Sequence, residues 1–507
     1  MPTTDAAVAA DPLAGRSATV VGAGFGGLAT ACYLADAGAD VTLLEQHDRP
    51  GGHANRIEDD GFTFDTGPSW YLMPDVFERF FGHFGREPSD YYDLVHLDPH
   101  YRVVWKGGAA GEIADSVDMR PDMAHNRAVF RSYEAGADDA LDAYLDEAAY
   151  TYEVGMERFV YEDRQRLRDF LDPEVVRSAR GLTFLGSMQD HVADYFEHPK
   201  LRQLMQYTLV FLGGSPYNTP ALYNLMSHVD FELGVFYPEG GIYSVVEGMV
   251  QLAEELGVEV ETGREVTGLA DAGDGVAVTT GDGRARTDLA VANANLAHVD
   301  RDLLPDGTRE TRQGYWEKRT YAPSAYMLYL GVEGDVDPLE HHTLVLPEDW
   351  EPHFRSIFEE PRWPADPAYY VNVPSVTDDS VAPEGHHAVV VLVPIAPGLD
   401  DDRAARGQFR EQVLDDLARH AGVDLRDRIV VEHEACISEF ASRYDDPQGT
   451  ALGLAHTLRQ TGPLRPGHRS SAVDGLYYTG SVTTPGIGVP MCLISGQHAA
   501  DAVVEDR

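Results

Sequence analysis

The chain has 507 residues, of which 43% are hydrophobic, and its formal net charge at pH 7 is −45. A chain of this length is expected to form more than one domain, and so negative a charge excludes the basic surface that nucleic-acid binding requires. The acidic residues are dispersed along the sequence, which is typical of a halophile's protein, because dispersed carboxylates maintain solubility in concentrated salt. A substrate-repelling or cation-binding role is the alternative interpretation.

No secretory or membrane-spanning segment is predicted. Residues 1–16 lack the basic start and apolar core of a signal peptide, and no apolar run reaches the length of about 18 residues that a spanning helix needs. The three cysteines, Cys32, Cys436 and Cys492, lie far apart in the sequence. They indicate neither a disulfide framework nor a metal centre, so a reducing cytoplasm and no metal site are expected.

Residues 18–45 are predicted to bind a dinucleotide. A short apolar strand leads directly into a G-x-G-x-x-G pattern, an amphipathic helix follows, and a second strand ends at Glu45. The glycines of such a unit allow the backbone to approach a pyrophosphate at the helix N-terminus, and the terminal acid accepts hydrogen bonds from ribose hydroxyls. Glu45 would repel a 2′-phosphate, which disfavours NADP. The predicted contacts are Gly22, Ala23, Gly24, Gly26, Gly27 and Glu45.

The residues that follow Glu45 favour FAD over NAD. A second glycine pair comes just past the acid, and residues 61–68 read as a strand that ends in a turn. This succession resembles flavoproteins of the amine-oxidase and desaturase superfamily, in which FAD lies extended. The resemblance implies further FAD contacts at Gly51, Gly52, His53, Arg56, Gly67 and Pro68.

The rest of the chain contains both helical and strand-like stretches. Residues 120–210 read as mostly helical, and residues 242–256 as an amphipathic helix ended by Gly257. Short strands are expected at 258–261, in a hairpin around 273–283, and at 289–292, 345–346, 370–373 and 387–393. An α/β fold is therefore predicted. A Rossmann-like FAD-binding domain, a parallel sheet with helices, takes residues 15–105, 230–300 and 425–507. An inserted substrate-binding domain of mixed sheet plus helices takes residues 106–229 and 301–424.

Residues 211–249 read FLGGSPYNTPALYNLMSHVDFELGVFYPEGGIYSVVEGM. The glycine pair, the helical stretch and the turn from Gly234 to Gly241 occur in the order found in the phytoene desaturase family, which this segment resembles. This is the FAD-dependent type of carotenoid biosynthesis in bacteria, archaea and fungi. Residues 325–331, 374–385 and 475–496 agree, so the resemblance covers nearly the whole chain. Two positions depart from the family pattern. His53 replaces an Arg, with Arg56 nearby, and Glu239 replaces a residue that is basic in many relatives.

The uncharged segment GSVTTPGIGVPMCLISG, at 480–496, is predicted to form the second half of the cofactor site. Gly486 and Gly488 let the backbone lie against the isoalloxazine without an intervening side chain, and Pro490 suits the first turn of a helix. That helix N-terminus is expected to point at the flavin N1–C2=O edge, where reduction builds negative charge. The predicted contacts around this half are Val266, Gly480, Ser481, Gly488, Val489 and Pro490.

The resemblance implies that the chain desaturates a carotenoid. A –CH2–CH2– unit of phytoene or of a later intermediate becomes –CH=CH– as flavin accepts a hydride. A polyene has almost no polar groups that a protein can hydrogen-bond, so its binding must come from burial of its apolar surface. Residues 184–188, 207–212 and 222–226 suit the walls of a tunnel.

Hydride loss leaves a delocalised cation, which then gives up a proton to a carboxylate or to water. Asp65 is the predicted catalytic residue, because it stands beside the presumed flavin loop at Thr66 and Gly67. The alternative is that Asp65 only caps or braces this loop. His228 and Glu232 are the other candidates.

A carotenoid resides in membrane, so peripheral association with the surface of the cytoplasmic membrane is expected. One candidate contact patch consists of Trp350, Phe354, Ile357, Phe358 and Trp363. Reduced flavin is expected to pass its electrons to a quinone or to O2. The sequence does not indicate an oligomeric state.

Three other functions compete with phytoene desaturation. The first is 3,4-desaturation of an end-modified C40 or C50 carotenoid, as in a bacterioruberin-type pathway. The second is an amine- or porphyrinogen-oxidising flavoenzyme of the same fold, which leaves the specific middle segment unexplained. The third is a prenyl-chain carrier that has lost FAD, against which the intact glycine loop and Glu45 argue.

Overall fold

A five-stranded parallel sheet forms the centre of the nucleotide-binding part. The computed structural model describes residues 11–107, 115–164, 186–457 and 459–507. The sheet has the strand order β19-β13-β1-β2-β9, and all four pairings are parallel. Its strands are β1 (Ser17–Val21), β2 (Asp40–Leu44), β9 (Glu259–Glu261), β13 (Leu289–Ala292) and β19 (Leu476–Tyr478). The predicted α/β fold with a parallel sheet is confirmed.

The centre of this sheet is buried on both faces, which explains why β13 and the carboxyl-terminal halves of β1 and β2 are apolar, whereas the edge strand β9 has the sequence Glu-Val-Glu. Val20, Leu43 and Val291 pack on one face against a helical layer. That layer consists of α1 (Phe25–Asp36), α9 (Ile242–Glu255) and α14 (Val489–Glu505). Val21 and Leu44 pack on the other face against a three-stranded antiparallel sheet. This sheet is β10 (Val266–Asp271), β11 (Val276–Thr280) and β12 (Gly283–Thr287), and it includes the predicted hairpin.

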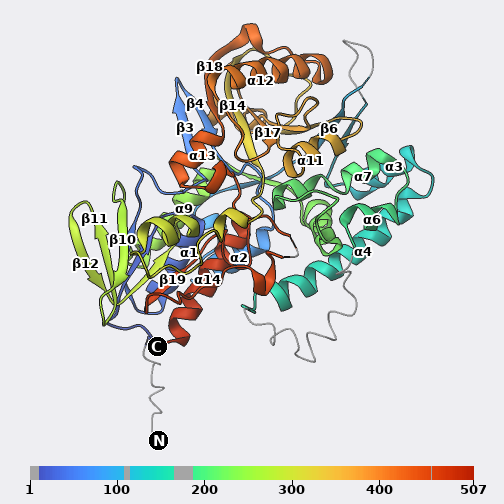
Figure 1. Ribbon diagram of the computed structural model, residues 1–507. Helices are drawn as coiled ribbons and strands as arrows, with labels where there is room; N and C mark the ends of the chain where they lie inside the picture. The colour runs from blue at the N-terminus through green and yellow to red at the C-terminus, as the bar shows by residue number, and fades with distance from the viewer. Residues whose placement is uncertain (1–10, 108–114, 165–185, 458) are drawn as a thin grey trace, which may run out of the picture.

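A seven-stranded mixed sheet organises the second part of the molecule (Figure 1). Its order is β18 (Ile429–Ala435), β14 (Ser324–Glu333), β17 (His386–Ile395), β16 (Tyr369–Asn372), β15 (His342–Leu346), β6 (Tyr101–Trp105) and β7 (Ser116–Met119). Side chains of β14 alternate between its two faces. Leu328 and Leu330 pack with the helix α12 (Arg403–Asp416), whereas Met327 and Tyr329 pack with β4 (Phe62–Asp65).

Two strands of this sheet lie outside the residue ranges that the sequence predicts for the second domain. Strand β6 pairs in parallel with β15, and β18 pairs antiparallel with β14, so both belong to the second sheet. The expected division had assigned residues up to 105 and from 425 onward to the nucleotide-binding part. A boundary read from the sequence misses such strands because pairing partners lie more than 90 residues away.

Helices gather at the end of the molecule far from the β10–β12 sheet (Figure 1). They are α3 (Met123–Tyr133), α4 (Ala137–Gly155), α6 (Met188–Ala193) and α7 (Pro199–Leu204). Their apolar sides bury Phe130, Tyr144 and Phe196 against β6 and its neighbours. The helices therefore extend the core of the seven-stranded sheet rather than forming a separate unit.

Helices α1 and α14 pack at a distance that only small residues permit. A Cβ added at Gly496 would lie 2.6 Å from the Ala29 Cβ and 2.9 Å from the Gly26 carbonyl oxygen. The Thr30 hydroxyl, which donates to the Gly26 carbonyl at 2.7 Å, lies in the same contact. The C-terminal helix is thus fixed against the first helix of the chain.

We expect Gly496→Ala to destabilise the protein, because its methyl group must push α14 away from α1. Overpacking of this kind costs about 1–3 kcal/mol. Gly407→Ala is the matched control, since Gly407 also lies within a helix, α12, and a Cβ there meets nothing within 4 Å. The control should gain about 0.5–1 kcal/mol from helix propensity. Thermal and denaturant unfolding of both variants would measure this, and equal stabilities would contradict the packing described.

Candidate active site

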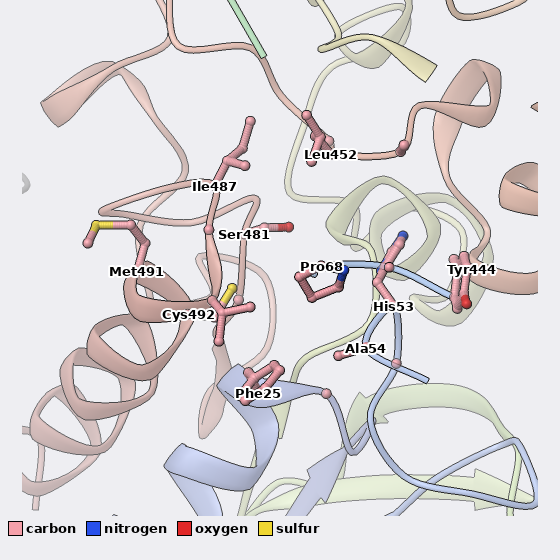
Figure 2. Close-up of a pocket in the computed structure, with 18 of the residues that line it drawn as sticks. Phe25, His53, Ala54, Pro68, Tyr444, Leu452, Ser481, Ile487, Met491 and Cys492 are labelled. Carbon is pink, nitrogen blue, oxygen red and sulfur yellow. The ribbon is translucent and has the colours of Figure 1, made fainter. Parts of the chain in front are cut away.

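A cavity of about 600 Å³ lies where the two parts of the molecule meet. Glycine-rich loops of the parallel sheet line one side, and aromatic and aliphatic side chains line much of the rest. Figure 2 shows Phe25, Met491 and Cys492 at the ends of two helices, opposite Pro68, His53 and Tyr444. The two helices are α1 and α14, so two helix N-termini reach the same cavity.

The loop between β1 and α1 forms a cradle of bare backbone. Gly22 has a φ of +96°, and a Cβ added at Gly27 would lie 2.0 Å from the Gly22 carbonyl oxygen. Helix α1 starts after Gly24 with no acidic residue in its first turn. Its free N–H groups and positive dipole end are therefore available to an anion such as a phosphate.

Glu45 closes this cradle from the end of β2. Its carboxylate accepts hydrogen bonds from the Ala23 N–H at 2.8 Å and from the His47 N–H at 2.9 Å. Glu45 lines the cavity although it is only 4% exposed. Its remaining lone pairs suit the hydroxyl groups of a ribose.

Asn293, which the sequence analysis missed, joins the two halves of the site. It follows β13, and its amide donates to the Gly22 carbonyl at 3.3 Å. Its Oδ1 would lie 2.7 Å from a Cβ at Gly26 and 2.6 Å from one at Gly480. The carboxyl ends of neighbouring parallel strands meet at one edge, and this rule could have indicated Asn293.

The loop before α14 is the second bare surface of the cavity. Gly486 and Gly488 have φ angles of +137° and +119°, which favour glycine. The Ile487 N–H donates to His456 Nε2 at 3.0 Å. His456 therefore carries its proton on Nδ1, which lies 2.7 Å from the Tyr223 hydroxyl. Burial lowers the pKa of His456 well below its usual 6.5, so this imidazole is neutral at pH 7.

A buried arginine supports this loop from behind. The Arg465 guanidinium donates to the backbone carbonyl oxygens of Leu454, Gln460, Ser481 and Thr483. Burial lowers the pKa of Arg465 to about 10, which still leaves it charged at pH 7. The positive charge lies close beneath the loop, because its Cζ is 3.3 Å from a Cβ added at Gly486.

Around His53, an aromatic stack borders the cavity. The His53 ring lies on the Tyr444 ring with centroids 3.9 Å apart, and its Nε2 is 2.8 Å from a carboxylate oxygen of Asp446. Tyr444 is the last residue of α13 (Ile437–Tyr444). His53 thus contacts the second domain, whereas Arg56 stacks on Tyr243, with its Cζ 4.6 Å from the ring centroid, and does not line the cavity.

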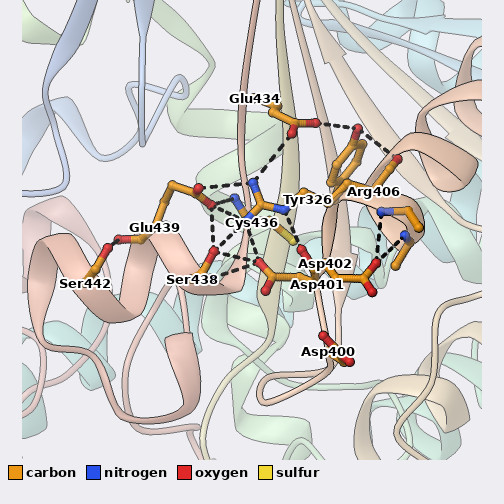
Figure 3. Close-up of polar contacts among 12 residues, drawn as sticks. Tyr326, Asp400, Asp401, Asp402, Arg406, Glu434, Cys436, Ser438, Glu439 and Ser442 are labelled. Carbon is orange, nitrogen blue, oxygen red and sulfur yellow. Dashed lines mark hydrogen bonds and ion pairs between the residues drawn. The ribbon is translucent and has the colours of Figure 1, made fainter.

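An ionic cluster on Arg406 holds α13 in place (Figure 3). Arg406 lies on α12, and its guanidinium contacts both the Asp401 and the Glu439 carboxylates at 2.6 Å. Glu439 also accepts the Cys436 N–H at 2.8 Å, which caps the start of α13. Because Arg406 is only 8% exposed, removing its carboxylate partners would leave a buried charge without compensation, which is costly.

Most of the predicted cofactor contacts lie together on the cavity wall. They are Gly22, Gly24, Gly26, Glu45, Gly51, Gly52, His53, Gly67, Pro68, Val266, Gly480, Ser481, Gly488, Val489 and Pro490. Ala23, Gly27 and Arg56 do not line the cavity, although Ala23 and Gly27 shape the cradle. The structure adds Asn293, Tyr444, Asp446 and the Tyr223–His456 pair.

Asp65 points away from this cavity. Its carboxylate accepts the N–H groups of Ile242 at 2.7 Å and Tyr243 at 3.2 Å, at the start of α9. Burial raises the pKa of Asp65 to about 7, against these donors and the Arg56 charge. This arrangement agrees with the alternative interpretation, that Asp65 braces structure. His228 and Glu232 pair with each other at 2.6 Å and do not line the cavity either.

Two of the apolar stretches expected in a tunnel do reach the cavity. Tyr207, Val210 and Leu212 line it, as do Tyr223, Leu225 and Met226. Of the third stretch, residues 184 and 185 lie outside the described residues, and Met188 is buried in the helical core.

The proposed membrane-contact patch is wrong for three of its members. Trp350, Phe354 and Ile357 are at most 5% exposed and line the cavity. The amphipathic pattern of α11 (Glu351–Phe358) therefore marks a side that faces the cavity interior rather than an outer surface. These side chains enlarge the apolar wall.

Comparison with known proteins agrees with this site. A family model described as "Flavin containing amine oxidoreductase" matches residues 25–504. The chain belongs to this family. It is 60% identical over 496 residues to a carotenoid 3,4-desaturase from Haloarcula japonica, covering 97% of this chain and 99% of that protein. It is 34% identical to a zeta-carotene-forming phytoene desaturase from Myxococcus xanthus, covering 97% and 94%.

A solved oxidoreductase from Methanosarcina mazei shares the fold of this family with the chain. Its TM-score is 0.62 at 17% identity, covering 96% of this chain and 100% of that one. As a member of the flavin-containing amine oxidoreductase family, the chain is an oxidoreductase that uses FAD. The cradle at Gly22–Gly27, the Glu45 carboxylate and the bare loop at 486–488 fit the phosphates, ribose and isoalloxazine of this cofactor.

Gly488→Asp should abolish flavin retention while leaving the protein folded. A carboxylate at the N-terminus of α14 would stabilise the helix but would occupy the cavity and repel a reduced, negatively charged flavin. Gly488→Ala is the control, because it introduces the same backbone strain at φ +119° without a charge. Visible flavin absorbance per chain and circular dichroism would measure both properties. Full flavin content in Gly488→Asp would disprove the position given to this loop.

Proposed function

We propose that this flavoprotein desaturates a carotenoid at its 3,4 bond. The observation that carries the proposal is the 60% identity to the Haloarcula japonica carotenoid 3,4-desaturase along 97% of the chain. Haloarcula is a halophilic archaeon, which agrees with the dispersed acidic residues and the net charge of −45. The reaction converts one –CH2–CH2– unit to –CH=CH–, with loss of a hydride and a proton.

The cavity supports an apolar, extended substrate. Trp350, Phe354 and Ile357 lie at the second-domain end, and Leu225 and Met226 add aliphatic surface. Burial of hydrocarbon against such walls contributes about 25 cal/mol per Å². These side chains exclude water and orient the polyene, which has no polar group along its length to fix its position.

The glycine loops support the redox half of the reaction. When bound, FAD supplies the acceptor for the hydride. The chain contributes the start of α14 and Gly488, which lines the cavity without a side chain, so a substrate carbon can approach at this position unobstructed. The N–H groups of the α14 terminus and the Arg465 charge favour an accumulating negative charge beside them.

In this proposal, a water molecule in the cavity accepts the proton that leaves the substrate. A delocalised carbocation is a strong acid, so no specialised base is required. Asp65 does not fit this role, because both of its oxygens accept backbone N–H groups of α9. The further acceptor of electrons is a quinone or O2.

We also propose that the protein takes its substrate from the surface of the cytoplasmic membrane. Among the described residues, no helix is long and apolar enough to cross a bilayer. A peripheral enzyme with an apolar cavity can extract a carotenoid without spanning the membrane.

Phytoene desaturation is the second candidate, favoured by the 34% identity to the Myxococcus xanthus enzyme. It ranks behind 3,4-desaturation because the identity is much lower over a similar length. Amine oxidation and porphyrinogen oxidation are not favoured. The solved putrescine oxidase and the solved putative protoporphyrinogen oxidase share the fold with this chain at only 17% identity.

The purified flavoprotein should convert a carotenoid with a saturated 3,4 bond next to its conjugated chain, presented in liposomes with a quinone. The product should have two hydrogens fewer and absorb at longer wavelength, because the new double bond extends the conjugation. Chromatography with mass detection would measure it, and Gly488→Asp provides the flavin-free control. Turnover of phytoene instead would establish the second candidate, and turnover of neither by a fully flavinated protein would refute both.

A further inference from the structure

Three potential metal ligands from distant parts of the chain meet behind the cavity wall. Asp163 follows the π-helix η2 (Met156–Val160), His468 precedes β19, and His498 lies on α14. One ligand atom from each lies within 4.8 Å of the other two. Both imidazoles are buried, while the carboxylate is exposed and open to solvent.

Hydrogen bonds fix the tautomers of both histidines. His468 Nδ1 lies 2.9 Å from the Tyr478 carbonyl oxygen, and His498 Nε2 lies 3.3 Å from that of Tyr161. A carbonyl only accepts, so these nitrogens carry the protons. The lone pairs are therefore on His468 Nε2 and His498 Nδ1, which leaves one nitrogen of each ring free to bind an ion. A histidine that donates one N–H to a backbone carbonyl while its other nitrogen binds an ion is the usual arrangement of metal-ligating imidazoles.

His498 Nδ1 has an unused lone pair. It has no hydrogen-bond partner among the described residues, and the side chain is only 3% exposed. An unpaired polar atom at such depth costs free energy unless a ligand satisfies it. Burial also lowers the pKa of both imidazoles.

Thr484 completes the surroundings of this point. Its hydroxyl lies 3.0 Å from His468 Nε2 and 3.3 Å from an Asp163 oxygen. Ligand atoms of a tetrahedral ion with bonds of about 2.0–2.1 Å are separated by roughly 3.3 Å. The cluster thus needs only a modest contraction, and either the hydroxyl or a water molecule can take the fourth position.

We propose that Asp163, His468 and His498 bind a zinc ion. Two imidazole nitrogens and one carboxylate oxygen suit Zn²⁺ and similar transition ions, whereas Mg²⁺ and Ca²⁺ prefer oxygen ligands alone. No sequence pattern indicates the site, because its ligands are separated by 305 and 30 residues, from 163 to 468 and from 468 to 498.

The ion would act as a clamp. It joins α14, whose N-terminus borders the cavity, to the segment after Met156 and Val160, which also line the cavity. Thr484 lies within the loop that leads into α14. The zinc ion therefore holds the flavin side of the cavity against its substrate side and takes no part in electron transfer, since Zn²⁺ has no redox chemistry.

Zinc binding to the full-length flavoprotein tests this assignment. The protein is stripped with a chelator and titrated with Zn²⁺ by calorimetry, and Co²⁺ serves as a spectroscopic substitute. We expect one strong site per chain and the visible bands of tetrahedral Co²⁺. His498→Gln and Asp163→Asn should each lower the Zn²⁺ affinity at least tenfold. Asp163 is exposed, so its variant carries little risk of misfolding.

His83→Gln is the matched control for background binding by an acidic chain. His83 also faces a carboxylate, that of Asp36 at 3.2 Å, but its side chain is 45% exposed and is not a member of the cluster. This variant should retain the affinity and the Co²⁺ bands of the parent. Affinity that falls equally in all three variants, or that survives both His498→Gln and Asp163→Asn, would overturn the proposal. Absence of a strong site in the parent would show that the cluster is only hydrogen-bonded.

Discussion

The contact between helices α1 and α14 is the constraint on which the active site depends. Each helix begins at the cavity, and Gly496 leaves no room for a side chain against Ala29 and the Gly26 carbonyl oxygen of α1. Because sliding would cause a clash and separation would expose buried apolar surface, the N-termini of the two helices stay at a fixed spacing. In the proposed site FAD would need that spacing, since the first helix would bind its phosphates and the second would meet its isoalloxazine. The contact joins the beginning and the end of the chain.

The strand order explains how so distant segments reach this contact. Strand β13 lies between β1 and β19, so the loop that follows it is bracketed by the two glycine-rich loops. Asn293 stands at that point and fills the space between Gly26 and Gly480. Each loop therefore depends on the other two for its shape. The part of the molecule built on the seven-stranded sheet then supplies the remaining wall through Tyr444, which the Arg406 cluster holds in position.

Local sequence patterns are sufficient to predict the glycine loops, Glu45 and individual strands, because these features depend on residues that are close together in the chain. Features that depend on tertiary contacts were not accessible in this way. Asp65 is next to the flavin loop in sequence, yet its carboxylate serves a helix that begins 177 residues later. Trp350 and Phe354 show an amphipathic pattern, but a pattern cannot distinguish a side that faces a cavity from one that faces a membrane. Neither Asn293 nor Arg465 belongs to a sequence motif that would indicate its role.

The positive charge of Arg465 affects a bound flavin as well as the packing of the loop. A net charge of −45 creates a negative potential around the protein, which opposes the build-up of negative charge on a bound flavin. Concentrated salt screens the surface carboxylates within a few ångströms, but a buried group is screened much less. Arg465 is fully enclosed, and its partners are neutral carbonyl oxygens rather than carboxylates, so its charge is not cancelled. Together with the α14 terminus it provides positive potential at the one loop where an acidic protein needs it.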